Sequence, residues 1–312
     1  MISARSARVC GLAFCLLGGG MPLFDHLRAA GPTKASASLQ TWFQYGIYDP
    51  GSRMSRNQIF SISHVFLYWQ DINTTALDRS IATADRNGRD LLVTVEPYTL
   101  ASDWRSGSRQ LLSDITAGRF DTQITDVCTA LSKAKHRIYV RWAHEMEGTE
   151  GRYPWAGKQP QNYIDAYRHF VTRCRALLPN AKYVWSPRGA SNFEAYYPGS
   201  DYVDVVGFAI WGLQRWEIKR TGRARTYLET LALTYQKMSG FGKPMMVAEA
   251  GAAGDQAYKS AWLSAMFQGQ TYANDFPNLF AVVYFNDKEP YHWPGGYGSP
   301  DWRMDEADIP QQ

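Results

Sequence analysis

A strand, a helix and a second strand follow one another in IYVRWA (138–143), NYIDAYRHFVTRCRALL (162–178) and YVWS (183–186). The two short runs are predominantly apolar, which is typical of strands that are buried on both faces of a parallel sheet. The run between them has the length and pattern of a helix, and Pro179 follows it as a stop signal. This stretch therefore predicts one βαβ unit.

The same alternation continues on both sides of this unit. We expect strands at 43–47, 64–68, 91–95, 138–143, 183–186, 203–208, 245–248 and 280–285, and helices at 75–87, 122–135, 162–178, 226–238 and 256–272. Eight strands alternating with helices predict an α/β fold of the TIM-barrel type, a (β/α)8 barrel, in a single domain at 38–312. A doubly wound open sheet is the alternative, and the tail after Met304 is expected to fray.

The first 37 residues have the pattern of an export signal. Arg5 and Arg8 precede an apolar run at 9–17, and small residues at 35–37 offer a cleavage site. Retention as an anchor is the alternative, but the run is short for a membrane span, so we expect no stable membrane insertion after cleavage. The chain is thus expected to be secreted or periplasmic. There Cys128 and Cys174 could pair, or they could remain two buried thiols.

Composition narrows the class of partner. The formal net charge is only +4, and the sequence has no run of Lys and Arg of the kind that nucleic-acid binding usually requires. The spacing around the cysteines suggests no metal site. We expect neither a metal nor an organic cofactor. We also expect the protein to be a monomer. The 11 Trp and 19 Tyr residues instead suit a sugar-binding cleft. Arg152, Arg188 and Arg215 leave room for an anionic glycan, with a solvated surface as the alternative.

Three carboxylates end predicted strands. They are Glu96, Glu145 and Glu249, and in a barrel of this type catalytic groups lie where strands end and loops begin. Hydrolysis of a glycosidic bond with retention of configuration requires two carboxyl groups about 5 to 5.5 Å apart, and Glu145 with Glu249 is the candidate pair. The alternative is that one or both are buried ion-pair partners, for instance of Arg141. Glu96 is expected either to contact or support the substrate or to form a structural ion pair.

A set of motifs in a specific order resembles glycoside hydrolase family 26, a clan-A family of retaining β-mannanases and related β-glucanases and β-xylanases. The motifs are HEM (144–146), YPW (153–155), WSP (185–187), YYPG (196–199), YVDVVG (202–207), KP (243–244), Glu249 with Gly251, YFN (284–286) and DWR (301–303). The resemblance implies that Glu145 is the acid/base and Glu249 the nucleophile. It also implies that His144 contacts the substrate or the nucleophile; a purely hydrogen-bonding residue is the alternative. Trp155 and Trp302 are implied to be aromatic walls for sugar rings, with core packing as the alternative for both.

The sequence departs from the family pattern at four positions. Glu147 and Arg188 each replace an Asn of the family motifs, and Glu147 is expected either near the site or in solvent. Ala209 stands where the family has Asp, and Trp211 stands where it has the Tyr that hydrogen-bonds the nucleophile. An indole donates one hydrogen bond and accepts none, so Trp211 could support Glu249 only in another geometry. These departures favour a glycan other than plain mannan, such as a bacterial exopolysaccharide with acidic groups.

Together these features predict an endo-acting retaining glycoside hydrolase with a polysaccharide substrate. Two rival hypotheses use the same barrel. One is a transglycosylase, which would pass the glycosyl group to a sugar acceptor and so remodel a polymer. The other is a barrel that binds glycan without cutting it, for which the changes at Ala209 and Trp211 are the evidence.

Overall fold

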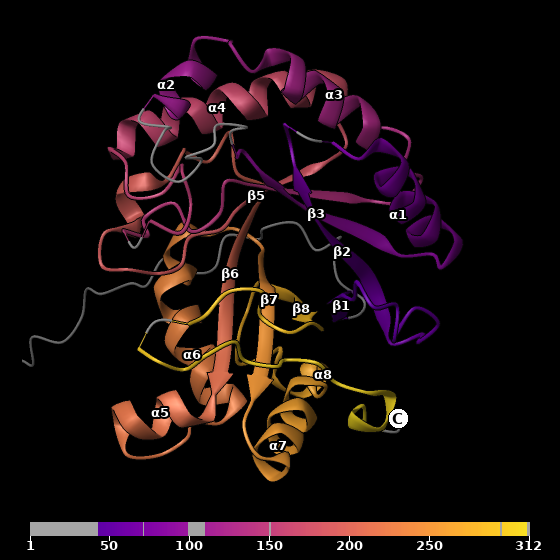
Figure 1. Ribbon diagram of the computed structural model, residues 1–312, viewed down its shortest axis with the longest axis vertical. Coiled ribbons are helices and arrows are strands. Elements are labelled where there is room, and N and C mark those ends of the chain that lie inside the picture. Colours follow the sequence, from indigo (N-terminus) through magenta and orange to yellow (C-terminus); the bar gives the residue numbers. More distant parts are fainter. Residues whose placement is uncertain (1–42, 71, 99–109, 150, 294, 311–312) are drawn as a thin grey trace, which may run out of the picture. The chain divides into compact units, whose positions relative to one another are not determined.

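Eight parallel strands form a closed barrel (Figure 1). The computed structural model describes residues 43–70, 72–98, 110–149, 151–293 and 295–310. The strands are β1 (Gln44–Tyr48), β2 (Phe60–Tyr68), β3 (Asp90–Glu96), β4 (Ile138–Trp142), β5 (Lys182–Trp185), β6 (Val205–Leu213), β7 (Met245–Ala253) and β8 (Leu279–Phe285). Because β8 pairs with β1 in parallel, the sheet has no edge. The predicted (β/α)8 barrel is confirmed, and the open-sheet alternative is excluded.

Helices surround the strands in Figure 1. They are α1 (Thr74–Arg86), α2 (Leu111–Thr116), α3 (Asp121–Leu131), α4 (Pro160–Leu177), α5 (Gln214–Thr221), α6 (Tyr227–Met238), α7 (Gln256–Met266) and α8 (Gly269–Tyr272), with short 3₁₀ turns at Phe193–Tyr196, Ser239–Phe241 and Glu306–Asp308. Local sequence sets their starts: Asn73 caps α1, Pro160 opens α4, and Thr226 forms a capping box with Glu229 in α6. α1 and α6 therefore begin where a side chain satisfies free backbone N–H groups, and α4 begins at a residue that has no N–H to satisfy.

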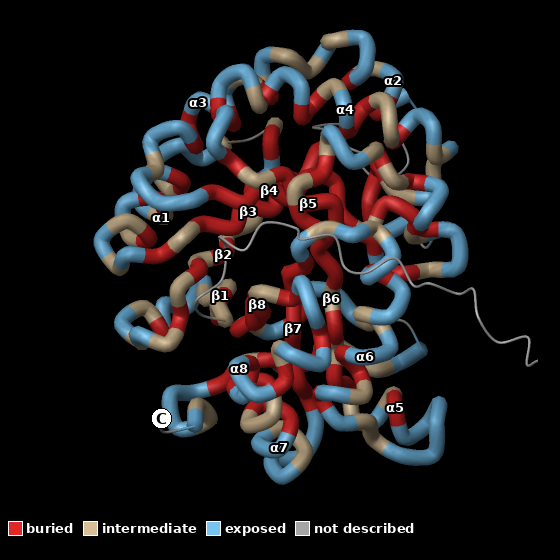
Figure 2. Tube along the Cα trace, turned by 180° about the vertical axis from the view of Figure 1, so that it is seen from behind, coloured by how far each residue is buried: buried red, intermediate tan, exposed pale blue. Residues whose placement is uncertain are grey.

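Two layers of apolar side chains make the core, and Figure 2 shows the strands as mostly buried. A small inner cluster fills the barrel with one or two residues from each of seven strands: Ile62, Leu92, Tyr139, Val184, Val205, Met246, Ala248, Ala281 and Val283. The remaining strand, β1, contributes Gly46, where a Cβ would lie 2.8 Å from Val283 Cγ2. Alternate residues such as Leu91 and Val93 face outward into the larger cluster that includes the helices.

Strands β6 and β7 extend well past the ends that the sequence predicted. β6 and β7 continue to Leu213 and Ala253, and they stay paired to their last residues. Glu249 consequently lies within β7 rather than after it. The segment beyond Glu249 reads AGAA, whose small residues have weak strand propensity, so sequence alone placed the strand end too early.

A disulfide joins Cys128 of α3 to Cys174 of α4, which settles the question that the sequence left open. No helix among the described residues is long and apolar enough to cross a membrane. The described part also contains no group of three or more His, Cys, Asp and Glu side chains that could hold a metal ion. The predicted export signal at 1–37 lies outside the described residues.

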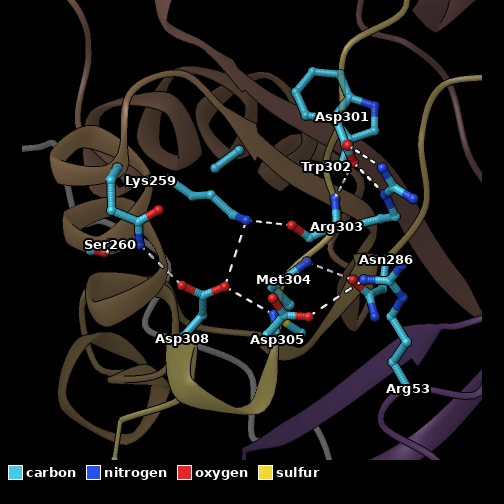
Figure 3. Close-up of polar contacts among 12 residues, drawn as sticks. Arg53, Lys259, Ser260, Asn286, Asp301, Trp302, Arg303, Met304, Asp305 and Asp308 are labelled. Carbon is cyan, nitrogen blue, oxygen red and sulfur yellow. Dashed lines mark hydrogen bonds and ion pairs between the residues drawn. The ribbon is translucent and has the colours of Figure 1, made fainter.

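The C-terminal segment is anchored, so the prediction of a frayed tail after Met304 was wrong. Met304 is fully buried, and its N–H donates to Asn286 Oδ1 at 2.7 Å. Figure 3 shows Asp305 facing Arg53, at 3.4 Å, and Asp308 facing Lys259, at 3.6 Å. These contacts connect the tail to the loop after β1 and to α7, and so fix the long connection that follows β8.

Candidate active site

Glu145 lies on a constrained turn directly after β4. Ala143 and Glu145 both have positive φ angles, 46° and 54°, which are uncommon for residues other than glycine. The surrounding strands hold this turn, since the Ala143 N–H donates to Val95 O and the Glu145 N–H donates to Ser186 O. Residues kept in such conformations cluster at functional sites. The backbone thus presents the Glu145 side chain, which is only partly buried, at the mouth of the barrel.

Glu249 lies at an irregularity in β7. The pairing register with β6 shifts between Phe208 and Ala209, which brings Ala209 opposite Glu249, and the register with β8 shifts between Val247 and Ala250. Bulges of this kind re-aim side chains beside active sites. The side chain is buried, and Arg141 Nη1 on β4 donates to Glu249 Oε1 at 2.5 Å. The ion pair considered as an alternative from the sequence is therefore present.

This ion pair is compatible with a nucleophilic role. The pKa of Glu249 is raised above its ordinary value: burial raises it most, the Arg141 guanidinium lowers it, and the charge of Glu145 raises it again. Arg141 is fully buried and also donates to Thr94 Oγ1 at 3.3 Å, so its position is fixed from both sides. A fixed cation in direct contact favours the ionised carboxylate that an attacking group requires. The effect of Glu145 shows that the two carboxyl groups share one electrostatic environment.

Glu96 is a third carboxyl group in this environment. It ends β3 and is almost completely buried. Burial first, and then the charge of Glu249, raise the pKa of Glu96 to about 8, against a lowering effect of Arg141. The shift favours the protonated form of Glu96 near neutral pH, and in that form the group can donate a hydrogen bond without adding a second negative charge beside Glu249.

His144 is buried and uncharged. Its Nε2 lies 3.0 Å from Tyr153 Oη, and burial together with Arg141 and Arg152 holds the pKa of the imidazole well below its usual range. Trp155 Nε1 donates to the His144 carbonyl at 2.8 Å, and its ring stacks on Tyr153 with centroids 4.7 Å apart. These contacts fix the turn that carries Glu145.

A cavity of about 480 Å³ opens beside Glu145. Its lining combines aromatic rings with charged side chains: Glu145, Arg152, Tyr153, Arg188, Ala209, Trp211, Trp216, Arg225, Glu289, Tyr291, His292 and Trp293 are among them. Of the residues selected from the sequence, Glu145, Arg152, Arg188 and Trp211 line this cavity. Glu249, Glu96 and His144 are instead buried residues outside its lining.

Three aromatic or acidic side chains differ from expectation. Trp155 and Trp302 have no exposed surface and do not line the cavity, so in this structure they are core residues rather than walls for sugar rings. Glu147 points neither into solvent nor into the cavity. It is buried, and its Oε1 accepts hydrogen bonds from the N–H groups of Gly189 and Ala190, which supports the loop carrying Arg188.

Trp211 does not occupy a position in which it supports Glu249. Its ring lies over Gly251, where a Cβ would be 2.8 Å from Cζ3, and its centroid is 4.9 Å from that of Trp302. Trp293 packs edge-on at 6.2 Å. Trp211 is therefore a cavity wall backed by other indoles, and among the described contacts Arg141 is the group that donates to Glu249.

Sequence reasoning missed Glu289. This carboxylate follows β8, is buried, and accepts from Arg152 Nη2 at 3.0 Å and from Trp302 Nε1 at 3.4 Å. It joins the loop after β4 to the loop after β8 across the cavity. An acid in a loop carries no strand-end signal, so only the aromatic residues around it could have drawn attention to this segment.

Comparisons with known proteins agree with this geometry. The family model described as glycosyl hydrolase family 26 matches residues 113–242. Endoglucanase H of Acetivibrio thermocellus is 25% identical over 248 residues, covering 74% of this chain and 25% of the relative. Beta-1,3-xylanase TXYA of a Vibrio species is 22% identical over 210 residues, covering 61% and 45%. The chain thus spans a quarter to less than half of the length of these relatives.

Solved structures share the fold. A family 26 β-mannanase from Bacteroides ovatus superposes with a TM-score of 0.60 at 17% identity, over 78% of this chain and 80% of that one. A modular endo-β-1,4-mannanase from Cellulomonas fimi gives a TM-score of 0.63 at 14% identity, over 86% and 69%. The family model and the closed barrel confirm the resemblance inferred from the motifs, which is to glycoside hydrolase family 26.

Proposed function

We propose that this protein is an endo-acting glycoside hydrolase that cleaves a β-linked polysaccharide with retention of configuration. The observation that carries the proposal is that two electrostatically coupled glutamates of one barrel lie in different settings. Glu145 lines the cavity, whereas Glu249 is buried against Arg141. Different environments for two carboxyl groups are what an acid and a nucleophile require.

The reaction has two displacements. In the first, Glu249 attacks the anomeric carbon while the bond to the leaving oxygen breaks and Glu145 gives its proton to that oxygen. In the second, Glu145 takes a proton from water, the water oxygen bonds to the anomeric carbon, and Glu249 leaves as a carboxylate. Arg141 stabilises the carboxylate at the start and at the end. Every proton and bond is accounted for by these two side chains, the glycan and water.

The relatives support a β-linked backbone. Their names include an endoglucanase, β-1,3-xylanases and a mannan endo-1,4-β-mannosidase from Bifidobacterium adolescentis. We also propose that the chain is exported and acts as a monomer. The disulfide between Cys128 and Cys174 supports export, because such bonds persist in oxidising compartments.

Transglycosylation is the second candidate function. The indole rings of Trp211, Trp216 and Trp293 line the cavity next to Glu145, where an incoming sugar could stack and exclude water. The distinction lies in the products. A transglycosylase would form longer oligosaccharides at high acceptor concentration, whereas a hydrolase would produce only shorter ones.

The test is reducing-sugar release from β-mannans, β-glucans, xylans and acidic exopolysaccharides. We expect the wild type to act on at least one polymer, and Glu145→Gln and Glu249→Ala to lose that release. Glu194→Gln, which changes an exposed carboxylate outside the cavity, is the matched control and should retain it. Binding of a polymer by the wild type without any release would favour the non-catalytic barrel instead.

A further inference from the structure

Positive charge is concentrated in one short segment beside the cavity. Residues 214–225 contain five Arg and Lys side chains and one carboxylate, so their formal charge is +4, equal to the net charge of the entire chain. The segment comprises α5 and the turn that follows it, directly after the long strand β6. The rest of the chain is thus balanced overall, and this segment carries the excess.

Two carboxylates contact the arginines of this segment. Glu217 is fully buried, accepts from the Arg225 N–H at 2.6 Å, and lies 3.4 Å from Arg225 Nε. Glu229 forms a two-point contact with Arg223, at 2.6 and 2.9 Å. Among the described residues, therefore, these acids hold Arg225 and Arg223 in place from behind.

The contacts of the other three cations in the segment leave their positive charge intact. Arg215 donates to the Tyr297 carbonyl at 3.2 Å, Lys219 lies over the Tyr297 ring at 5.7 Å, and Arg220 lies over the Trp216 ring at 5.2 Å. Carbonyl and ring contacts orient a cation without neutralising it. The exposed side of α5 is consequently a preoriented basic surface.

This surface is continuous with the cavity. Trp216 lies between Arg220 and Arg225, with Arg225 5.8 Å from the ring centroid, and both Trp216 and Arg225 line the cavity. Arg188, which is exposed on the loop after β5, lines the same cavity. We call Arg188, Arg215, Lys219, Arg220 and Arg225 the basic wall. It extends from the cavity that contains Glu145 out to α5.

We propose that the basic wall recognises acidic groups on the glycan, so that the preferred substrate is a polysaccharide carrying carboxylates along its chain. This inference rests on the proposed function, because it places the polymer in the same cavity. Guanidinium groups bind carboxylates through two parallel hydrogen bonds, and the interleaved Trp216 offers a flat surface to the sugar ring. A neutral mannan or glucan would leave most of this charge without a ligand.

The experiment compares polymers that share a backbone and differ only in charge. β-Glucan and β-mannan are used both as the parent polymer and after oxidation of C6 to the carboxylate. We expect the ratio of kcat/KM for oxidised over parent polymer to exceed one at low salt and to fall as NaCl screens the charges. In Arg215→Gln/Arg220→Gln the ratio should drop about tenfold, since each exposed ion pair contributes up to about 1 kcal/mol. Arg220→Lys should retain most of the preference.

A charge-matched control and an activity-independent readout separate this proposal from the proposed function. Arg79→Gln removes an exposed charge from α1 and should keep the wild-type ratio. Affinity electrophoresis of Glu249→Ala in gels containing each polymer measures recognition without turnover.

If that variant prefers the oxidised polymers while the wild type cleaves none, acid recognition stands and hydrolysis fails. Equal cleavage of parent and oxidised polymers, unchanged in Arg215→Gln/Arg220→Gln, would overturn acid recognition and leave the hydrolase. Retardation by single-stranded DNA as strong as by oxidised glycan would also overturn it, since the surface would then bind any polyanion.

Discussion

Glu145 and Glu249 are the same amino acid in two contrasting settings. Glu145 stands on a turn with positive φ angles and faces a cavity, while Glu249 lies in an irregular strand and contacts a buried arginine. The first setting gives access to solvent and to a leaving group. The second provides a fixed counter-charge in a site from which water is largely excluded. The difference teaches that backbone and neighbours, rather than side-chain type, distinguish the two groups to which we assign the proposed roles of acid and nucleophile.

Removing Arg141, the counter-charge of Glu249, should have the largest effect on activity, because it would abolish this contrast. In Arg141→Met, Glu249 loses the cation that lowers its pKa, so the pKa of Glu249 rises further. Because attack requires the ionised form, we expect the acidic limb of the kcat/KM profile to move to higher pH, and activity at pH 6 to fall by about 10²-fold or more. The measurement is a pH–rate profile of both proteins. Arg137→Met, which removes an exposed arginine directly before the same strand, should keep the wild-type limb.

Removing the proposed acid should slow the cleavage of polysaccharide more than the cleavage of a substrate with a good leaving group. Glu145→Gln cannot protonate a leaving oxygen, so we expect kcat/KM on polysaccharide to fall about 10²- to 10⁴-fold. An aryl glycoside with a good leaving group does not need that proton, and its cleavage should be impaired much less. Equal losses on both substrates would contradict the assignment of Glu145 as the acid.

Substitution of Glu96 tests whether this group shares the electrostatic environment of Glu249. The expected effect, on the pH dependence of stability, is smaller than the effects above. Its pKa of about 8 is above the ordinary value, so the folded state favours the protonated form. The stability that this shift contributes to the folded state is fully present at a pH below the ordinary pKa of a glutamate, and it is lost as the pH rises through about 8. Thermal unfolding should therefore show wild-type Tm falling between pH 5 and pH 9 by more than that of Glu96→Gln, which stays neutral. Parallel curves for the two proteins would show that Glu96 is ionised at neutral pH.

The smallest effect is expected at Ala143, which tests the strained turn. Glycine adopts positive φ at no steric cost, so Ala143→Gly should leave the free energy of unfolding unchanged or raise it by up to about 1 kcal/mol. Ala82→Gly, at an exposed position in α1, should instead lower it by about 0.5 to 1 kcal/mol. Denaturant unfolding compares the two variants. Equal losses would mean that the turn after β4 stores no strain.

Much of this architecture could be predicted from the sequence. Eight apolar runs with helices between them define the barrel, and strand-end carboxylates mark its mouth because both signals are local. The contact between Arg141 and Glu249 joins residues 108 positions apart, so the sequence could offer it only as an alternative. Trp155 and Trp302 show the limit of motif reasoning, since burial depends on which rings pack around them. The extension of β6 and β7 was missed because it depends on pairing rather than on propensity.

The central claim, that Glu249 is the nucleophile, is tested most directly by trapping it. The wild type is incubated with a 2-deoxy-2-fluoro β-glycoside of a hydrolysed sugar, digested, and analysed by tandem mass spectrometry. We predict one glycosyl adduct per molecule, located on Glu249 in the peptide spanning β7, and absent from Glu249→Ala. An adduct on Glu96 or Glu145, or turnover of substrate to a product of inverted configuration, would contradict the account.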